Sequence, residues 1–508
     1  MSESFSEKEA APADVVYNPV DTNAILDGER DYLPGDELYI DPKVEAKIVR
    51  KFDIHIAPLI LVIYIICALD RSNIGNAAAA GMSTDLHLTG NQLNVAVSIY
   101  YVTYVCAEIP VTMLCRQFPA RFMMPGVMCI WAFVMVGSGF MTNYAGLIVT
   151  RLMIGLCEAG ESLRVFAVLG LTKQDWSGMY KRREQSRRFA ILFLSLMLSG
   201  AVGGLFASGF LKMDGVQGKR GWRWIYLMEA VISFAVAIIV FIFLPNNAAT
   251  AYFFNEEEKA VIKKRDAQRA AYMGHAKIQK IDFTKAFKDP KIYLSAAIQF
   301  SVDVCLYGFS TFLPVIISGL GKGFTGVRAQ LLTVPVYAAA AVVYVICAFG
   351  MDHFENRHRF IIPAAIVNII GYAVLIGVGD GHYHVKYAMT FLVGCGLYVA
   401  DGGNMTWLII NQAPQIKRSI GIATQQMMGN AGGIVAGQIY MARDKPNYHI
   451  GHSISMAFMC VALVFTFIKA WYLKRVNKRR EEMSPEERQR LIDEGVVGDI
   501  HPDFRLKL

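Results

Sequence analysis

Ionisable side chains interrupt several of the most apolar stretches of this 508-residue chain. The stretch LVIYIICALDRSNIGNAAAAG places Asp70 beside Arg71, and RLMIGLCEAG places Arg151 seven residues before Glu158. Seven residues are about two helical turns, so a helix would present Arg151 and Glu158 on one face. A guanidinium can bind a carboxylate bidentately, whereas a carboxyl group in an apolar pocket can accept and release a proton. These four residues therefore suit the coupled movement of an organic anion and a proton.

Asp70 and Arg71 cannot both face one direction, because successive helical residues point about 100° apart. We expect one of them to meet a partner on another helix, with Arg151 or Glu158 as the candidates. A second interpretation stays open, in which these charges form structural salt bridges that lock one end of a helix bundle. Ion pairs that hold a gate shut would also be compatible with transport.

Long hydrophobic runs predict the helices that must position these charges. The composition, with 54% hydrophobic and 18% charged residues, is too apolar for an ordinary soluble protein. A helix that crosses a bilayer needs about 20 mostly apolar residues, and about twelve such runs are present. The fold class is therefore predicted to be an all-α polytopic membrane protein. The predicted spans are 52–76, 92–115, 123–142, 144–171, 188–210, 222–244, 291–317, 329–350, 360–379, 385–408, 418–440 and 450–473.

An internal repeat divides the spans into two groups of six. The segment MLSGAVGGLFASG of the fifth span resembles MMGNAGGIVAG of the eleventh, as two parallel six-helix repeats predict. The GxxxG spacing in both segments favours close contact between helix backbones. The predicted domains are a disordered cytoplasmic N-terminal tail at 1–51, an N-terminal six-helix half at 52–244, a cytoplasmic connecting loop at 245–290, a C-terminal six-helix half at 291–473 and a cytoplasmic C-terminal tail at 474–508.

Lysine and arginine gather in loops on one side of the predicted bundle. The stretch KQDWSGMYKRREQSRR (173–188) contains six of them, and KRVNKRR (474–480) contains five. Because positively charged loops stay in the cytoplasm, both termini are predicted to be cytoplasmic. The anionic inner leaflet of the membrane explains the net charge of +8 better than nucleic acid does.

Eight segments, in order along about residues 50–475, carry a resemblance to a known family. They are LDRSNIGNA, STDLHLTGNQ, AEIP, RLMIGLCEAG, GWRWIY, DVCLYGFSTFLPVII, RAQLLTVPVYA and GNAGGIVAGQIY. Together they resemble the fungal anion:cation symporter family, which includes allantoate and nicotinate permeases, within the major facilitator superfamily. The resemblance implies a twelve-helix bundle of two six-helix halves that works by alternating access. It also implies proton coupling at Asp70 and Glu158 and anion binding by Arg71 and Arg151.

The seventh and tenth predicted spans contain further candidates. Asp303 matches the family's DV-LYG-S-FLP pattern, either as a second proton site or as a residue that orients the helix, and Tyr307 shares its face and could bind substrate. Trp407 and Asn411 lie one turn apart. The Trp ring could stack on a flat heteroaromatic anion, or it could pack beside a hydrogen-bonded Asn near the cytoplasmic end. Asp401, in a run expected to be more apolar, is a candidate for substrate specificity.

The segment ESLRVFAVLGLTKQDWSGMYKRREQ (161–185) departs from the family pattern. It is longer than in the family, lacks the usual proline and inserts Glu161 and Arg164 into the fourth span. Three explanations stay open: a specialised cavity that reads a further charge, a fourth span that ends early, or a mis-joined segment that replaces the usual helix.

We predict proton-coupled uptake of a small organic anion, such as a carboxylate, across a fungal plasma membrane. The proton is the expected coupling ion, and no other cofactor or metal is expected. The expected partners are the anion and the lipid bilayer, without nucleic acid, for a monomeric carrier. The alternatives are an exporter of a secondary metabolite and a nutrient receptor that binds without transporting. An enzyme is disfavoured, since the sequence has no recognisable nucleophile–base pair, metal-ligand spacing or phosphate loop.

Overall fold

Long α-helices account for the regular structure of the described chain. The computed structural model describes residues 39–508 except 116–117, 160–181, 247–250, 274–283, 285, 322–323, 325, 380, 414 and 494–497. The twelve helices at the positions of the predicted spans are α3 (Ala57–Ala79), α5 (Gln92–Cys115), α6 (Ala120–Gly139), α7 (Tyr144–Glu158), α9 (Arg182–Phe210), α10 (Gly221–Phe243), α13 (Pro290–Gly319), α14 (Val327–Phe354), α15 (His358–Gly377), α16 (Tyr383–Ile410), α17 (Gln415–Ala436) and α18 (His449–Glu481). The shorter helices used below are α2 (Pro42–His55), α4 (Met82–Asp85), α11 (Glu256–Met273), α19 (Pro485–Asp493) and the 3-10 turn η1 (Leu211–Met213).

The predicted all-α membrane fold is confirmed. Within the described residues, nine stretches are long and apolar enough to cross a membrane. The helices α7, α16 and α17 lie at the remaining predicted positions, and α7 has only 15 described residues. Helices are the expected solution here, because each backbone polar group in a bilayer must find its hydrogen-bond partner within the protein.

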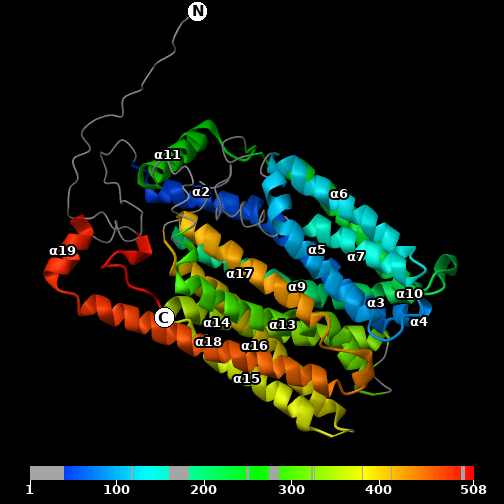
Figure 1. The fold of residues 1–508 in the computed structure, drawn as a ribbon. Coiled ribbons are helices and arrows are strands. Elements are labelled where there is room, and N and C mark those ends of the chain that lie inside the picture. The colour runs from blue at the N-terminus through cyan, green and yellow to red at the C-terminus, as the bar shows by residue number, and fades with distance from the viewer. Residues whose placement is uncertain are drawn as a thin grey trace, which may run out of the picture.

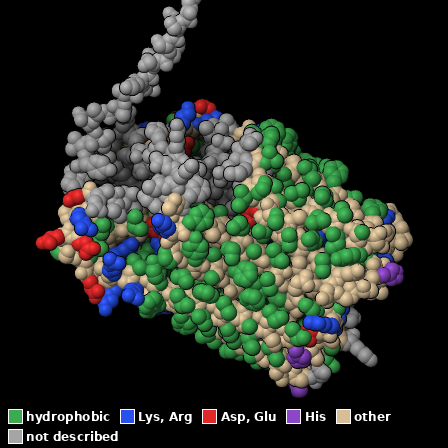
Figure 2. All heavy atoms as spheres, in the orientation of Figure 1, with side chains coloured by type: hydrophobic (Ala, Val, Ile, Leu, Met, Phe, Trp, Pro, Cys, Tyr) green, Lys and Arg blue, Asp and Glu red, His purple; other side chains and the backbone are tan. Residues whose placement is uncertain are grey.

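Apolar side chains cover the flank of the helix bundle (Figure 2). Phe133 in α6, Ile346 and Phe349 in α14 and Trp471 in α18 are each more than half exposed. Charged side chains gather instead at the end of the bundle that carries α19 (Figure 2). An exposed apolar band of this kind suits contact with lipid rather than water.

In the described part of the chain, the N-terminal six helices contact the C-terminal six through α9 with α14 and α16, α5 with α17, and α3 with α13. Glycines of the two repeated segments lie at these contacts. A Cβ atom added at Gly204 would lie 2.8 Å from the carbonyl oxygen of Gln330, and one added at Gly437 would overlap Ser98. The GxxxG segments thus allow the close approach for which their spacing is suited.

The helices α2, α11 and α19 lie at one end of the bundle, and α4 lies at the other (Figure 1). Part of the predicted disordered tail is helical, since α2 begins at Pro42, where Asp41 caps it by accepting a hydrogen bond from the Lys43 amide. Phe52 is buried against the rings of Phe253 and Phe254, which gives this helix an apolar contact that the prediction missed. The expectations for residues 1–38 and for Glu161 and Arg164 lie outside the described residues.

Candidate functional site

Arg71 and Glu158 form an ion pair between α3 and α7. Arg71 Nε lies 3.2 Å from Glu158 Oε2, and this carboxylate is fully buried. Tyr100 of α5 donates a hydrogen bond of 2.6 Å to the same oxygen. Tyr104 lies against the guanidinium, 5.0 Å from its ring centre to Arg71 Cζ. The sequence expectation that one member of the Asp70–Arg71 pair meets a charge on another helix is therefore confirmed for Arg71.

Asp70 faces a different part of the bundle from Arg71. Its Oδ1 accepts a 3.3 Å hydrogen bond from Asn73, while Oδ2 has no hydrogen-bond partner among the described residues. Arg151 lies on the same side and donates a 3.1 Å hydrogen bond to the hydroxyl of Tyr226 in α10. The two charges of α7 thus meet different partners, although both are buried.

Aromatic side chains connect the Arg71–Glu158 pair to the C-terminal six helices. The ring of Tyr101 in α5 lies 4.9 Å from the ring of Tyr307 in α13, between ring centres. The Tyr307 hydroxyl donates a 2.9 Å hydrogen bond to Asn430 in α17. Tyr307 therefore lies between the two groups of helices, where its role in substrate binding remains a prediction.

Asp303 and Asp401 share one hydrogen-bond donor inside the C-terminal helices. Gln299 Nε2 donates to both oxygens of Asp303, at 3.1 and 3.2 Å, and to Asp401. The carbonyl oxygen of Gln299 in turn accepts from Asn404 and Gln425, at 2.9 and 3.2 Å. The buried ammonium of Lys469 completes this network through Asn404 Oδ1 at 3.2 Å. The structure thus joins two carboxyl groups whose roles the sequence analysis predicted separately.

Trp407 and Asn411 both contact the C-terminal segment of the chain, and the stacking of Trp407 on substrate remains a prediction. Trp407 Nε1 and Asn411 Nδ2 both donate to the carbonyl oxygen of Lys507, at 3.0 and 2.8 Å. Lys469 lies 4.0 Å from the centre of the Trp407 ring, and the His358 ring stacks on it. The contacts are those of the other interpretation left open above, a packed Trp beside a hydrogen-bonded Asn.

A cluster of buried charges holds the same end of the C-terminal helices together. Lys417 Nζ lies 2.6 Å from Asp289 and 2.8 Å from Asp499, and Lys291 lies 3.4 Å from Asp289. Asp289 precedes α13 and caps it by accepting from the Lys291 amide. Burial by itself raises the pKa of Asp289, but the ammonium groups of Lys291 and Lys417 outweigh it and hold that pKa below its usual value.

The sequence analysis missed several buried ionisable residues in the described part of the chain, among them Glu229 and Lys469. Both lie inside predicted spans, Glu229 in the sixth and Lys469 in the twelfth. The signal was available, since any ionisable residue inside a span is a candidate for function. The described residues contain no group of three His, Cys, Asp or Glu side chains that could hold a metal ion.

Comparisons with known proteins agree with the helical architecture. A family model described as Major Facilitator Superfamily matches residues 60–437. An uncharacterized transporter of Schizosaccharomyces pombe is 39% identical over 478 residues, which cover 94% of this chain and 93% of the relative. The high-affinity nicotinic acid transporter of Saccharomyces cerevisiae is 34% identical over 438 residues, which cover 86% and 80%.

Solved structures show the same fold. The crystal structure of a bacterial homologue of the human lysosomal transporter Spinster, in an inward-facing and occupied conformation, matches with a TM-score of 0.63. The match covers 82% of this chain and 97% of the other, with 14% sequence identity. At this identity the comparison shows the fold alone.

Proposed function

Because this chain belongs to the major facilitator superfamily and is a membrane transporter, we propose that it carries a small organic anion, a carboxylate such as nicotinate, into the cell together with a proton. The observation that carries this proposal is the ion pair between Arg71 and Glu158. The nicotinic acid transporter among the relatives supports the substrate class. The buried ionisable groups also support transport over a purely structural bundle, because such groups in membrane helices are costly and usually functional.

The Arg71 guanidinium serves as the anion-binding group in this proposal. In the present structure it holds the carboxylate of Glu158, so a substrate carboxylate would have to replace a carboxylate of the protein. Protonation of Glu158 removes its negative charge and weakens its hold on Arg71. The substrate carboxylate can then pair with the freed guanidinium, which binds carboxylates through two parallel hydrogen bonds.

This exchange couples the two solutes through charge balance. One proton enters with one carboxylate, so the Arg71–Glu158 site is neutral both before and after both solutes bind. An anion without a proton would leave two carboxylates competing for one guanidinium, which is unfavourable in a buried site. Tyr100 and Tyr104 keep the pair in place, since one bonds to Glu158 and the other lies against Arg71.

The carrier also has a proposed cellular location, oligomeric state and orientation in the membrane. We propose that it is a monomer in the plasma membrane with both chain termini in the cytoplasm, and the positively charged loops support this orientation of the termini. The end of the bundle with α2, α11 and α19 would then face the cytoplasm (Figure 1).

Uptake into vesicles tests the proposed function. The full chain is reconstituted into proteoliposomes and offered labelled nicotinate, allantoate, pantothenate or biotin, with and without an inward proton gradient. Gradient-dependent accumulation of one compound is the expected result. Extrusion of substrate against the gradient would indicate an exporter, and saturable binding without accumulation would indicate a receptor. Either result would overturn the proposal.

The Glu158→Gln variant tests the role of Glu158 in the same uptake assay, because it keeps the shape of the side chain and removes its titratable proton. Glu482→Gln is the control, since Glu482 lies exposed just after α18, far from the proposed site. The control should retain gradient-driven accumulation.

A further inference from the structure

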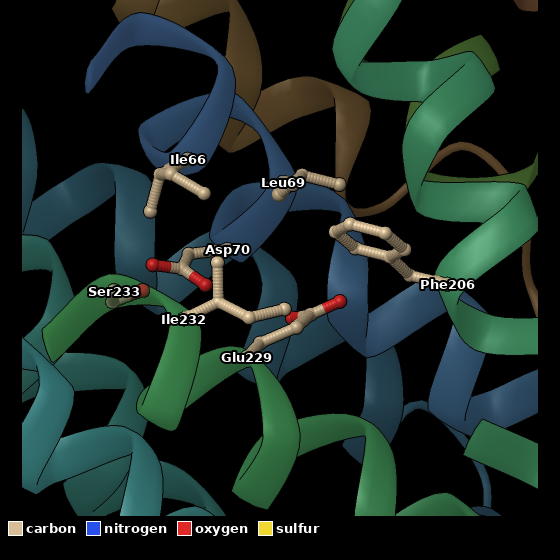
Figure 3. A pocket seen from close by; sticks show the side chains of 7 residues that line it. All are labelled: Ile66, Leu69, Asp70, Phe206, Glu229, Ile232 and Ser233. Carbon is tan, nitrogen blue, oxygen red and sulfur yellow. The ribbon is translucent and has the colours of Figure 1, made fainter. Parts of the chain in front are cut away.

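Glu229 is a buried acid of α10 that the proposed exchange does not use. Only 3% of the residue is exposed, and both carboxylate oxygens lack a hydrogen-bond partner among the described residues. Its side chain extends from α10 toward the same small pocket as Asp70 of α3, with Ser233 at the edge (Figure 3). Burying an ionised carboxylate without a partner is strongly unfavourable, so this position needs an explanation.

The pocket between Glu229 and Asp70 provides little solvation. Its other lining residues are apolar: Ile66, Leu69, Phe206 and Ile232. The space between the side chains is too small to hold a water molecule. The Ser233 hydroxyl is fully buried, lines the pocket and has no hydrogen-bond partner among the described residues. The site therefore contains unsatisfied polar atoms from two helices and no room for solvent.

One cation lies near these two acids. Arg151 of α7 interacts electrostatically with both Asp70 and Glu229, and its guanidinium is held by Tyr226, one turn from Glu229 on α10. The carboxylate of Glu158 also acts on Asp70, but its own charge is balanced by Arg71. The helices α6 and α9 and the turn η1 also contact α10, but in the described part of the chain they add no ionisable side chain to the pocket lining. A single guanidinium balances one carboxylate, so the second carboxyl group is expected to carry a proton.

We propose that Asp70 and Glu229 share one exchangeable proton and form a second proton-carrying site beside the Arg71–Glu158 pair. This proposal rests on the proposed function for its place in transport. The proton resides on one of the two carboxyl groups, and the other stays ionised near Arg151. With the proton bound, Asp70, Glu229 and Arg151 together are neutral, and release of the proton leaves one net negative charge.

The positions of these residues connect the shared proton to substrate binding. Asp70 is the neighbour of Arg71 on α3, and Arg151 lies two helical turns from Glu158 on α7. The helices α3 and α7 therefore each carry one residue of the Arg71–Glu158 pair. Each also carries one residue of the shared-proton site, Asp70 on α3 and Arg151 on α7. A shift of α3 against α7 that separates Arg71 from Glu158 would also change the distance between Asp70 and Arg151. Loss of the shared proton then disfavours the arrangement in which Arg151 is drawn away from Asp70.

Infrared difference spectroscopy tests the shared proton without any substrate. The purified full chain in lipid nanodiscs is titrated with pH while the carbonyl band of protonated carboxylic acids is recorded. We expect Glu229→Gln and Asp70→Asn each to remove the same component of this band, and Glu229→Asp and Glu482→Gln to retain it. An unchanged band in both neutralised variants would overturn the proposal. Loss of the wild-type band on adding sodium chloride would also overturn it, because the site would then bind a metal cation.

Transport of labelled nicotinate by the same proteoliposomes tests the coupling. Glu229→Gln should lose proton-driven accumulation while it retains exchange of labelled for unlabelled nicotinate at equal pH. Full accumulation by Glu229→Gln, together with a lost infrared component, would overturn the role in coupling. If the wild-type protein moves no nicotinate, the proposed substrate fails, and the infrared experiment still decides whether the proton is shared.

Discussion

Asn94 of α5 donates hydrogen bonds to the backbone carbonyl oxygen of Gly437, at 2.7 Å, and to that of Tyr440, at 3.0 Å. Ser98, one turn later, donates to the carbonyl oxygen of Ile434 at 2.9 Å. These bonds join the two groups of six helices near the first residues of α5, at the end opposite α2 and α11 (Figure 1). Alternating access requires such a contact to open and close.

Gly437→Ala is expected to disrupt this closed contact. The added Cβ atom would overlap Ser98, whose backbone cannot move without shifting α5. We expect the variant to lower the free energy of unfolding by about 1 to 3 kcal/mol, the usual cost of an overpacked contact. Thermal unfolding in detergent measures the change. Gly377→Ala is the control, because no atom lies within 4 Å of its added Cβ, and an equal loss in both variants would contradict the prediction.

Arg71→Lys should weaken anion binding even though the substitution keeps the positive charge. A lysine ammonium cannot form two parallel hydrogen bonds with a carboxylate, and the variant would lose the contact of the guanidinium with the Tyr104 ring. We expect the apparent Kd for nicotinate to rise by about tenfold or more, since a charge-assisted hydrogen bond contributes about 1.5 to 3 kcal/mol. Equilibrium binding to the purified protein is the measurement, and an unchanged Kd would argue against Arg71 as the anion-binding group.

Asn411→Ala separates the two interpretations of the tenth predicted span. Asn411 donates to the Lys507 carbonyl and accepts from the Lys507 amide, each at 2.8 Å. The variant should release the C-terminal segment, so that trypsin cleaves after Arg505 faster than in the wild-type protein. Nicotinate affinity should stay unchanged. Weaker nicotinate binding with normal resistance to trypsin would instead restore the predicted role of Asn411 at the substrate.

Acid should destabilise the cluster of Asp289, Lys291, Lys417 and Asp499. The pKa of Asp289 is lowered in the folded protein, so its stabilising effect is complete above the ordinary pKa and is lost as the pH falls through the lowered value. Asp289→Asn should therefore unfold more easily at neutral pH, by about 1 to 3 kcal/mol. Its Tm should also change less than that of the wild-type protein between about pH 7 and pH 3.

The control for this experiment is Lys478→Met, which removes an exposed partner of Glu482, at 3.6 Å. Exposed pairs of this kind contribute at most about 1 kcal/mol. Parallel Tm curves for Asp289→Asn and the wild-type protein would show that Asp289 does not contribute to the pH dependence.

Gln299→Leu should lower the Tm more than Asp401→Asn does. Gln299 is the shared donor for Asp303 and Asp401, so its removal leaves buried acceptors unsatisfied, at about 1 to 3 kcal/mol for each group. Asp401→Asn instead removes one of two neighbouring buried carboxyl groups and should preserve or raise the Tm. A lower Tm for Asp401→Asn than for Gln299→Leu would refute this account of the network.

Most of the helical architecture was predictable from the sequence. Predicted span 92–115 matches the bounds of α5, and span 222–244 differs from α10 by one residue at each end. This accuracy has a physical cause, because a bilayer core demands long apolar helices and so makes their positions visible in local composition. The error at α2 arose because its apolar contacts, such as Phe52 with Phe254, come from distant residues.

The sequence by itself thus determined which residues cross the membrane and which charges accompany them. It placed Asp70, Arg71, Arg151 and Glu158 inside helices, since hydropathy and helical periodicity are local properties. Only the tertiary structure decided their partners. It paired Arg71 with Glu158 and placed Asp70 and Glu229 at one pocket, because packing between helices that are distant in sequence sets which faces meet.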